Sequence, residues 1–314
     1  SLSAWTAMVL ETAEAGGRIH SVFPRAVNLV DAEGRLICIS SLGGGAVPFG
    51  LLVPAHGVVR MAMHGLRASM QVVLSRTGVH IPEAGWQIDL RTAEVLTPQR
   101  ALGDAIPPGE ARLESLLRLL NRRNGSEKRG FTVESFAEYR PDTGRRSGRD
   151  PFLEALMKRL RASLDAQKRG EPEEASTELL GMIGLGSGLT PAGDDLLVGI
   201  MVALDACRLS PRAAPLYRHL ARGLYRFSGE GTTDVAHAYL IHAVQGRFAE
   251  RLIAVRDAVL RGVEDADLEK ALDWLLSFGA ASGGETALGL LTGFYLIDQT
   301  SLRPEAIAAA SHSD

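Results

Sequence analysis

The sequence predicts an α+β protein, with a β-rich N-terminal domain followed by a mainly α-helical C-terminal domain. Short β-rich runs separated by turn residues fill the first third of the chain, and apolar residues recur every three to four positions after Pro151. Strand and helix patterns do not alternate, which argues against a doubly wound parallel sheet. We expect the two domains at residues 1–120 and 151–314, joined by a basic linker or mobile loop at residues 121–150.

The N-terminal elements follow from β-rich runs and turn signals. Residues 26–30 and 36–40 flank the turn sequence Asp31-Ala-Glu-Gly34, which is typical of a hairpin. Further strands are expected at residues 51–53, 70–74 and 86–90, and Pro107-Pro108 opens a helix that contains five leucines.

The next segment is polar, and the rest of the chain is helical in pattern. Residues 121–149 hold eight Lys or Arg and four Asp or Glu, which fits a solvated loop or, alternatively, a basic surface for an anionic partner. Apolar faces at helical spacing predict helices at residues 152–164, 196–204, 216–227, 235–244, 252–263 and 268–278.

Composition excludes several classes of protein. The formal net charge of −3 gives no electrostatic case for binding nucleic acid or a membrane surface. The longest apolar run, residues 196–207, is shorter than the roughly 20 residues of a membrane-spanning helix. Residues 1–10 lack the pattern of a signal peptide, so we expect a cytoplasmic protein. Cys38 and Cys207 have no zinc-site spacing and are expected to be buried free thiols.

Glycine is concentrated where chemistry is expected. The chain has 34 glycines, and five of them fall within residues 181–193, directly before the apolar run at 196–204. Thr190 is a good N-cap and Pro191 a good first residue for that helix. The start of a buried helix leaves N–H groups without partners, which either capping side chains or an anionic ligand could satisfy. The segment matches no Walker, Rossmann or nucleophile-elbow pattern.

Two acids, Asp194 and Asp195, stand at this same helix start and would repel an anion. A Mg²⁺ ion could bridge carboxylate and anion. Alternatively, a carboxylate could accept hydrogen bonds from a substrate amide while backbone N–H groups hold the anionic end of the same molecule. Consecutive helical residues point about 100° apart, so we expect only one of the two acids to face the ligand.

Two further helix starts have a related pattern. Ser282 and Glu285 fit a capping box, and Thr232 or Thr233 can cap a helix or bind an oxyanion. We expect these segments to converge with the first one around a single pocket, with the basic loop closing over it. The predicted catalytic residues are Asp194 and Asp195, and the predicted substrate-binding residues are Gly184, Gly186, Ser187, Gly188, Thr190, Gly193, Thr232, Thr233, Ser282, Gly283 and Glu285.

The segment from Gly184 to Asp195 resembles the signature of a bacterial family associated with the AllH subunit of oxamate carbamoyltransferase. This chain has Ala192 at the family's usual serine, and Ala280 and Glu285 where polar or His and Asp residues are expected. Looser similarity extends to residues 23–28, 44–54, 233–246 and Ser282-Gly283. The resemblance implies carbamoyl transfer between carbamoyl phosphate and oxamate, in purine-nitrogen catabolism, by a multi-subunit enzyme.

The leading hypothesis is therefore an enzyme or enzyme subunit that binds a small anionic metabolite and acts in carbamoyl transfer. A Mg²⁺-dependent phosphotransferase with a non-Walker phosphate loop and a non-catalytic regulatory or scaffold subunit are the alternatives. The expected partners are the metabolite and either other protein subunits or further copies of this chain. No cofactor is indicated with certainty, and Mg²⁺ stays open.

Overall fold

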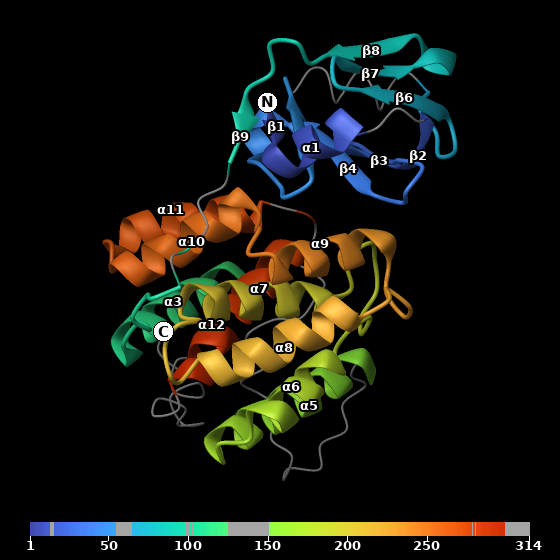
Figure 1. Ribbon diagram of the computed structural model, residues 1–314. Coiled ribbons are helices and arrows are strands. Elements are labelled where there is room, and N and C mark those ends of the chain that lie inside the picture. Colours follow the sequence, from blue (N-terminus) through green and yellow to red (C-terminus); the bar gives the residue numbers. More distant parts are fainter. Residues whose placement is uncertain are drawn as a thin grey trace. The chain divides into compact units, whose positions relative to one another are not determined.

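The computed structural model describes residues 1–12, 16–54, 65–97, 101, 103–124, 151–277, 279 and 281–298. The chain divides into two compact units: residues 1–99 with 247–250, and residues 100–246 with 251–314. The first carries the sheet and the second carries helices, so the predicted α+β class is confirmed (Figure 1).

The strands of the described residues form one sheet of nine, in the order β8-β7-β6-β2-β3-β4-β5-β1-β9. Its pairings are antiparallel except β4 with β5 and β1 with β9, which are parallel. The elements are β1 (Leu2–Ser3), α1 (Ala4–Thr12), β2 (Gly16–Phe23), β3 (Ala26–Val30), β4 (Leu36–Ser41), β5 (Gly50–Val53), β6 (Gln71–Ser75), β7 (Gly78–Ile81), β8 (Trp86–Asp89) and β9 (Val95–Leu96).

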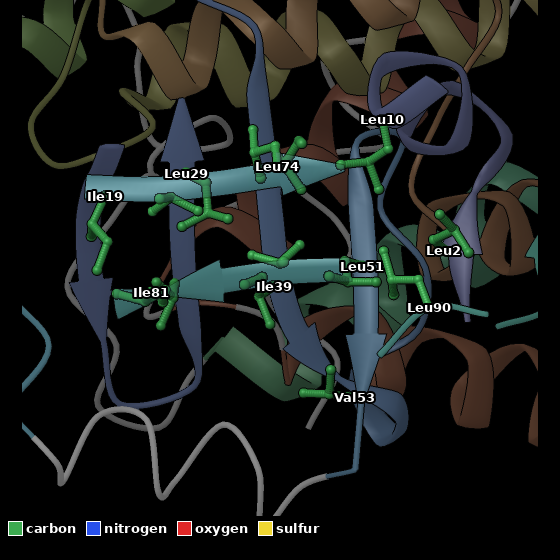
Figure 2. Packing of buried hydrophobic residues seen from close by; sticks show 14 of the residues in the cluster. Leu2, Leu10, Ile19, Leu29, Ile39, Leu51, Val53, Leu74, Ile81 and Leu90 are labelled. Carbon is green, nitrogen blue, oxygen red and sulfur yellow. The ribbon is translucent and has the colours of Figure 1, made fainter. Parts of the chain in front are cut away.

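The sheet curves into an open half-barrel around one apolar core. In Figure 2, β6 and β7 cross over the strands that carry Ile19, Leu29 and Ile39, and the labelled side chains lie between the two layers. Alternation along the strands produces this core: Val72 and Leu74 are buried, whereas Val73 between them is half exposed. The hairpin predicted at residues 26–40 is confirmed as β3 and β4.

The second unit is a set of packed helices (Figure 1). Each predicted helical run has a counterpart, and α6 is an additional helix that the sequence pattern did not indicate. The elements are α3 (Glu110–Asn124), α5 (Pro151–Lys168), α6 (Pro172–Leu180), α7 (Ala192–Ala206), α8 (Ala214–Arg226), α9 (Asp234–Val244), α10 (Glu250–Arg261), α11 (Asp265–Leu276) and α12 (Ser282–Ile297).

Helix α3 belongs to the helical unit, although the leucines that form it lie within the range 1–120 expected for the β-rich domain. Its last turn carries Arg123, which forms ion pairs with Glu269 and Asp273 of α11 at 2.9 Å each. Leu113, Leu116 and Leu120 on its inner face are fully buried. These contacts account for its grouping with the helices.

Helices α7 and α12 form the centre of this unit, and both are almost entirely buried. Glycines let their backbones touch. A Cβ atom at Gly199 would lie 2.1 Å from the carbonyl oxygen of Thr286, and one at Gly289 would lie 2.1 Å from that of Leu196. Some of the glycine enrichment therefore serves helix packing, which holds the two helix starts in fixed positions.

Two smaller expectations concern cysteines and membranes. Cys38 and Cys207 are both free and buried, as predicted. Burial raises the pKa of the Cys38 thiol to about 12, which keeps it protonated and unreactive. None of the helices in the described part of the chain is long and apolar enough to cross a membrane.

Candidate functional site

A turn of alternating glycines, residues 184–190, leads into α7 and is called the glycine turn below. Gly184, Gly186 and Gly188 all have positive φ angles, which other residues rarely adopt. Gly184 also packs so tightly that a Cβ atom would lie 2.0 Å from the carbonyl oxygen of Gly231. Gly188, in contrast, has no atom within 4 Å of its Cβ position. The turn is thus anchored at one end and open at the other.

The start of α7 differs from the prediction. Thr190 is not its N-cap: Pro191 occupies that position without a side-chain cap, and the Thr190 hydroxyl instead hydrogen-bonds Ser282 Oγ at 2.8 Å. The N–H of Gly193 donates to Leu185 O, and those of Asp194 and Asp195 donate to Pro191 O. The first N–H groups of the helix are therefore used inside the protein, and Gly193 serves packing, with its Cβ position 1.9 Å from Met182 O.

The donors available to a ligand lie earlier, in the glycine turn itself. The N–H groups of Gly186, Ser187 and Gly188 donate to no partner among the described residues. Ser187 and Gly188 are exposed, and Gly186 is half-buried. Consecutive N–H groups in a turn whose φ angles alternate in sign can point towards one anion. Unpaired N–H donors thus lie in the turn, whereas the sequence analysis placed them at the helix start.

The second segment precedes α9 and uses its two threonines differently. Thr233 is the N-cap, as predicted, accepting from Ala236 N at 3.1 Å, and its hydroxyl donates to Leu189 O in the glycine turn. Thr232 Oγ1 donates to Asp194 Oδ2 at 3.0 Å. Gly231, which packs against Gly184, was not singled out by the sequence analysis. The signal for it is the repeated Gly-x-Gly pattern of Gly229 and Gly231 just before the threonines.

The third segment is the start of α12, where the predicted capping box is absent. Ala281 occupies the N-cap without a side-chain cap, so Ser282 is the first helical residue. The Ser282 hydroxyl turns to Thr190, and the buried Glu285 lies one position beyond the N3 place of a capping box. Gly283 serves packing, since a Cβ atom there would lie 2.3 Å from Leu275 O.

The three segments therefore meet, and the single pocket expected among them stays a prediction. The glycine turn contacts the α9 segment through Thr233 and Leu189, and it contacts the α12 segment through Thr190 and Ser282. The predicted basic loop at residues 121–149 lies outside the described residues after position 124. Within the described ranges, no group of three or more His, Cys, Asp or Glu side chains could hold a metal ion.

Asp194 is the best-connected acid of this site. Its Oδ2 atom accepts from Gly184 N at 2.9 Å and from Thr232, while its Oδ1 atom is buried without a hydrogen-bond partner. Only 1% of the residue is exposed. Burial raises the pKa of Asp194 to about 6, and the hydrogen bonds from Gly184 and Thr232 limit that rise. At neutral pH its carboxylate is mostly ionised.

Asp195 points to a different neighbour. Burial first, and then the charge of Glu285, raise the pKa of Asp195 well above its ordinary value of 3.8, while hydrogen bonds with Ser282 and Thr190 oppose that rise. Its Oδ2 atom is also buried without a partner. Adjacent acids thus diverge, Asp194 towards the α9 segment and Asp195 towards α12, as expected for neighbours on a helix. Both acids are buried, and the expectation that only one of them faces a ligand stays a prediction.

The fold and site define a class: an α+β protein whose helical half joins a glycine turn to a pair of buried acids. A family model described as oxamate carbamoyltransferase subunit AllH matches residues 182–294, which include all three segments. A second, described as the AllH family N-terminal domain, matches residues 2–95, which include the sheet. The chain belongs to the AllH family. No curated protein and no solved structure matched in the corresponding comparisons.

Proposed function

We propose that this chain is the substrate-binding subunit of an oxamate carbamoyltransferase and that the glycine turn, with Asp194 and Asp195, is its binding site. The family description supports the reaction class, since the matching model covers the whole of this site. The reaction moves a carbamoyl group from carbamoyl phosphate to oxamate. We place it in the cytoplasm and in purine-nitrogen catabolism.

One observation carries the proposal: unused donors and unused acceptors occur in the same small region. Gly186, Ser187 and Gly188 present N–H groups without partners among the described residues. Asp194 and Asp195 each keep one buried oxygen without a partner. Buried polar atoms are nearly always hydrogen-bonded in folded proteins, so the two unpaired carboxylate oxygens favour a ligand, and the exposed N–H groups of the turn are open to one.

The substrates fit this arrangement chemically. Oxamate carries a carboxylate at one end and an amide NH₂ at the other, and carbamoyl phosphate pairs a phosphate with a carbamoyl NH₂. The N–H groups of the glycine turn suit the anionic end, while carboxylate and hydroxyl oxygens suit the amide hydrogens. The hydroxyls of Thr190, Thr232 and Ser282 are only half-buried, in contrast to the two acids, and would make first contact with the ligand.

The family description of a subunit implies further polypeptides, and we propose that the active enzyme is a complex of this chain with other subunits. The alternative of a Mg²⁺-dependent phosphotransferase has no ligand set in its favour among the described residues. A purely scaffolding role would account for the packing glycines Gly193, Gly199, Gly283 and Gly289, but it leaves the unpaired atoms of the glycine turn and the acids unexplained.

Thermal unfolding with and without ligands tests the proposal. Oxamate should stabilise the chain, by about 2.7 kcal/mol at a hundredfold excess over its dissociation constant. Oxalate is the matched control, because it replaces the amide with a second carboxylate that the acids should repel. Replacing Ser187 with Pro removes one free N–H and should weaken oxamate binding, whereas the distant surface change Thr177→Ala should leave it unchanged. Equal stabilisation by oxamate and oxalate, or none by either oxamate or carbamoyl phosphate, would refute the proposed site.

A further inference from the structure

A hydrogen bond between Thr232 and Asp194 fixes the direction of the threonine hydroxyl. The hydroxyl has one hydrogen, and it donates that hydrogen to Asp194 Oδ2 at 3.0 Å. Its two lone pairs therefore remain as acceptors for another molecule. Thr232 is half-buried, whereas Asp194 is 1% exposed. A ligand approaching this side of the site thus reaches the hydroxyl before it reaches the carboxylate.

Asp194 itself is held rigidly behind that hydroxyl. Its Oδ2 atom accepts from Gly184 N at 2.9 Å, and Gly184 is fixed against the carbonyl of Gly231, one residue before Thr232. Its Oδ1 atom is buried and has no partner. A carboxylate with one oxygen oriented by two donors and the other left unpaired is a poor structural element, since an apolar residue would avoid the cost of burial.

We propose that the Thr232 hydroxyl contacts the amide nitrogen of the carbamoyl acceptor and passes its proton to Asp194, which acts through the hydroxyl as the base. This inference rests on the proposed function. In the step, the acceptor nitrogen gives its proton to Thr232 Oγ as the Thr232 hydrogen moves to Asp194 Oδ2. The nitrogen lone pair then forms a bond to the carbamoyl carbon, and the carbon–oxygen bond to phosphate breaks. The phosphate leaves with that electron pair and finally takes the proton from Asp194.

The chemistry of the acceptor explains why a base is needed. The lone pair of an amide nitrogen is delocalised into its carbonyl group, so the nitrogen is a weak nucleophile until it loses a proton. A positioned base typically contributes 10²- to 10⁴-fold to such a step. With its pKa raised to about 6, Asp194 is mostly ionised at neutral pH and yet basic enough to take a proton transiently.

The pH dependence of the reaction should report Asp194 together with its surroundings. Asp195 shares its helix, and burial, followed by the charge of Glu285, raises its own pKa. Ionisable side chains on the helices packed against α7 include Glu285 on α12 and Asp234, His237 and His242 on α9. Arg159 of α5 lies against Gly181, before the turn, and pairs with Glu178 of α6.

The experiment compares pH profiles of carbamoyl transfer in the complete enzyme, purified through a tag on this chain. For the wild type, kcat should rise with pH through about 6 and then level off. Thr232→Val and Asp194→Asn should lower kcat at pH 7.5 about 100-fold or more and remove that rise, with KM for oxamate changed only a few-fold. Thr232→Ser keeps the hydroxyl and should restore both the rate and the profile.

Two substitutions on the same central helices are matched controls. Thr292→Val removes a buried hydroxyl that bonds only Leu288 O within α12, and Asp205→Asn changes a buried acid at the far end of α7. Both should keep the wild-type profile, and circular dichroism checks the fold of every variant. If Thr232→Val is folded and retains the rate and the pH rise, the relay is wrong while the proposed function stands. If the wild type neither binds oxamate nor transfers the carbamoyl group, both are overturned.

Discussion

Asp194 shows how a single side chain can be placed by residues far from it in the sequence. Its position at the start of an apolar helix marks it as a candidate from the sequence alone. Its donor Thr232 lies 38 positions away, and no local pattern connects the two. The acids could therefore be singled out, because they stand beside a glycine-rich segment at the start of an all-apolar helix, but their partners depend on how the helices pack.

Burial of Asp194 makes a prediction about stability against pH. Its folded pKa of about 6 lies above its ordinary value of 3.8, so the folded state binds the proton more tightly than the unfolded state does. The free energy of unfolding that Asp194 contributes should therefore rise as pH falls from about 6 towards 4, by about 2 kcal/mol over that range. Asp195 contributes in the same direction, because its pKa is also raised.

Urea unfolding of the wild type and of Asp194→Asn between pH 4 and pH 7 measures this contribution of Asp194 to the free energy of unfolding. Asparagine keeps the shape and cannot titrate, so the stability of the variant relative to the wild type should be greatest at pH 7. That advantage should shrink by about 2 kcal/mol between pH 7 and pH 4. If the difference in free energy of unfolding between the two proteins is constant across this range, burial does not raise the pKa of Asp194.

At the scale of elements, helix starts reveal what the sequence could and could not specify. Thr233 was correctly expected as a cap, and its hydroxyl accepts from Ala236 N three residues on. Thr190 and Ser282 have the same local signal, but each hydroxyl bonds the other across the site, 92 residues apart. A capping pattern cannot show whether a nearby hydroxyl from another segment competes for the same side chain.

The same limit applies to strands and helices as a whole. The hairpin at residues 26–30 and 36–40 could be predicted, because a β-rich run on each side of a turn is a local feature of the sequence. The two-residue strands β1 and β9 were missed, since they are defined by pairing with distant segments, β1 with β5 and β9 with β1. Helix α6 was missed as well, since its nine residues carry three glutamates and only a short apolar face.

Contact between α7 and α12 gives a prediction at this scale. Gly→Ala inside a helix normally stabilises by up to about 1 kcal/mol, but a Cβ atom at Gly199 would lie 2.1 Å from Thr286 O. Gly199→Ala should therefore lower the melting temperature, by roughly 5–10 °C for the 2–3 kcal/mol typical of an overpacked core.

Gly223→Ala on α8 is the matched control, because its nearest neighbour is the flexible end of Leu180 rather than backbone. That variant should melt within a few degrees of the wild type. Calorimetric melting of both variants makes the comparison. If Gly199→Ala is as stable as Gly223→Ala, α7 and α12 do not touch at this point.

For the whole molecule, both units belong to one family architecture, since one family model matches the sheet and the other matches the helices that carry the site. The helical unit alone brings together the glycine turn, the α9 segment and the α12 start. Hydrogen bonds from Thr233 to Leu189 and between Thr190 and Ser282 close that arrangement. The sheet contributes none of the residues of the proposed site, so we assign the binding of substrate to the helical unit.

A crystal structure of the chain with oxamate tests this account most directly. The account predicts that the oxamate carboxylate accepts hydrogen bonds from N–H groups of Gly186, Ser187 and Gly188. It also predicts that the amide nitrogen lies within hydrogen-bonding distance of Thr232 Oγ1, with Asp194 behind it. Oxamate bound away from the glycine turn, or bound there with its carboxylate facing Asp194 and Asp195, would contradict the account.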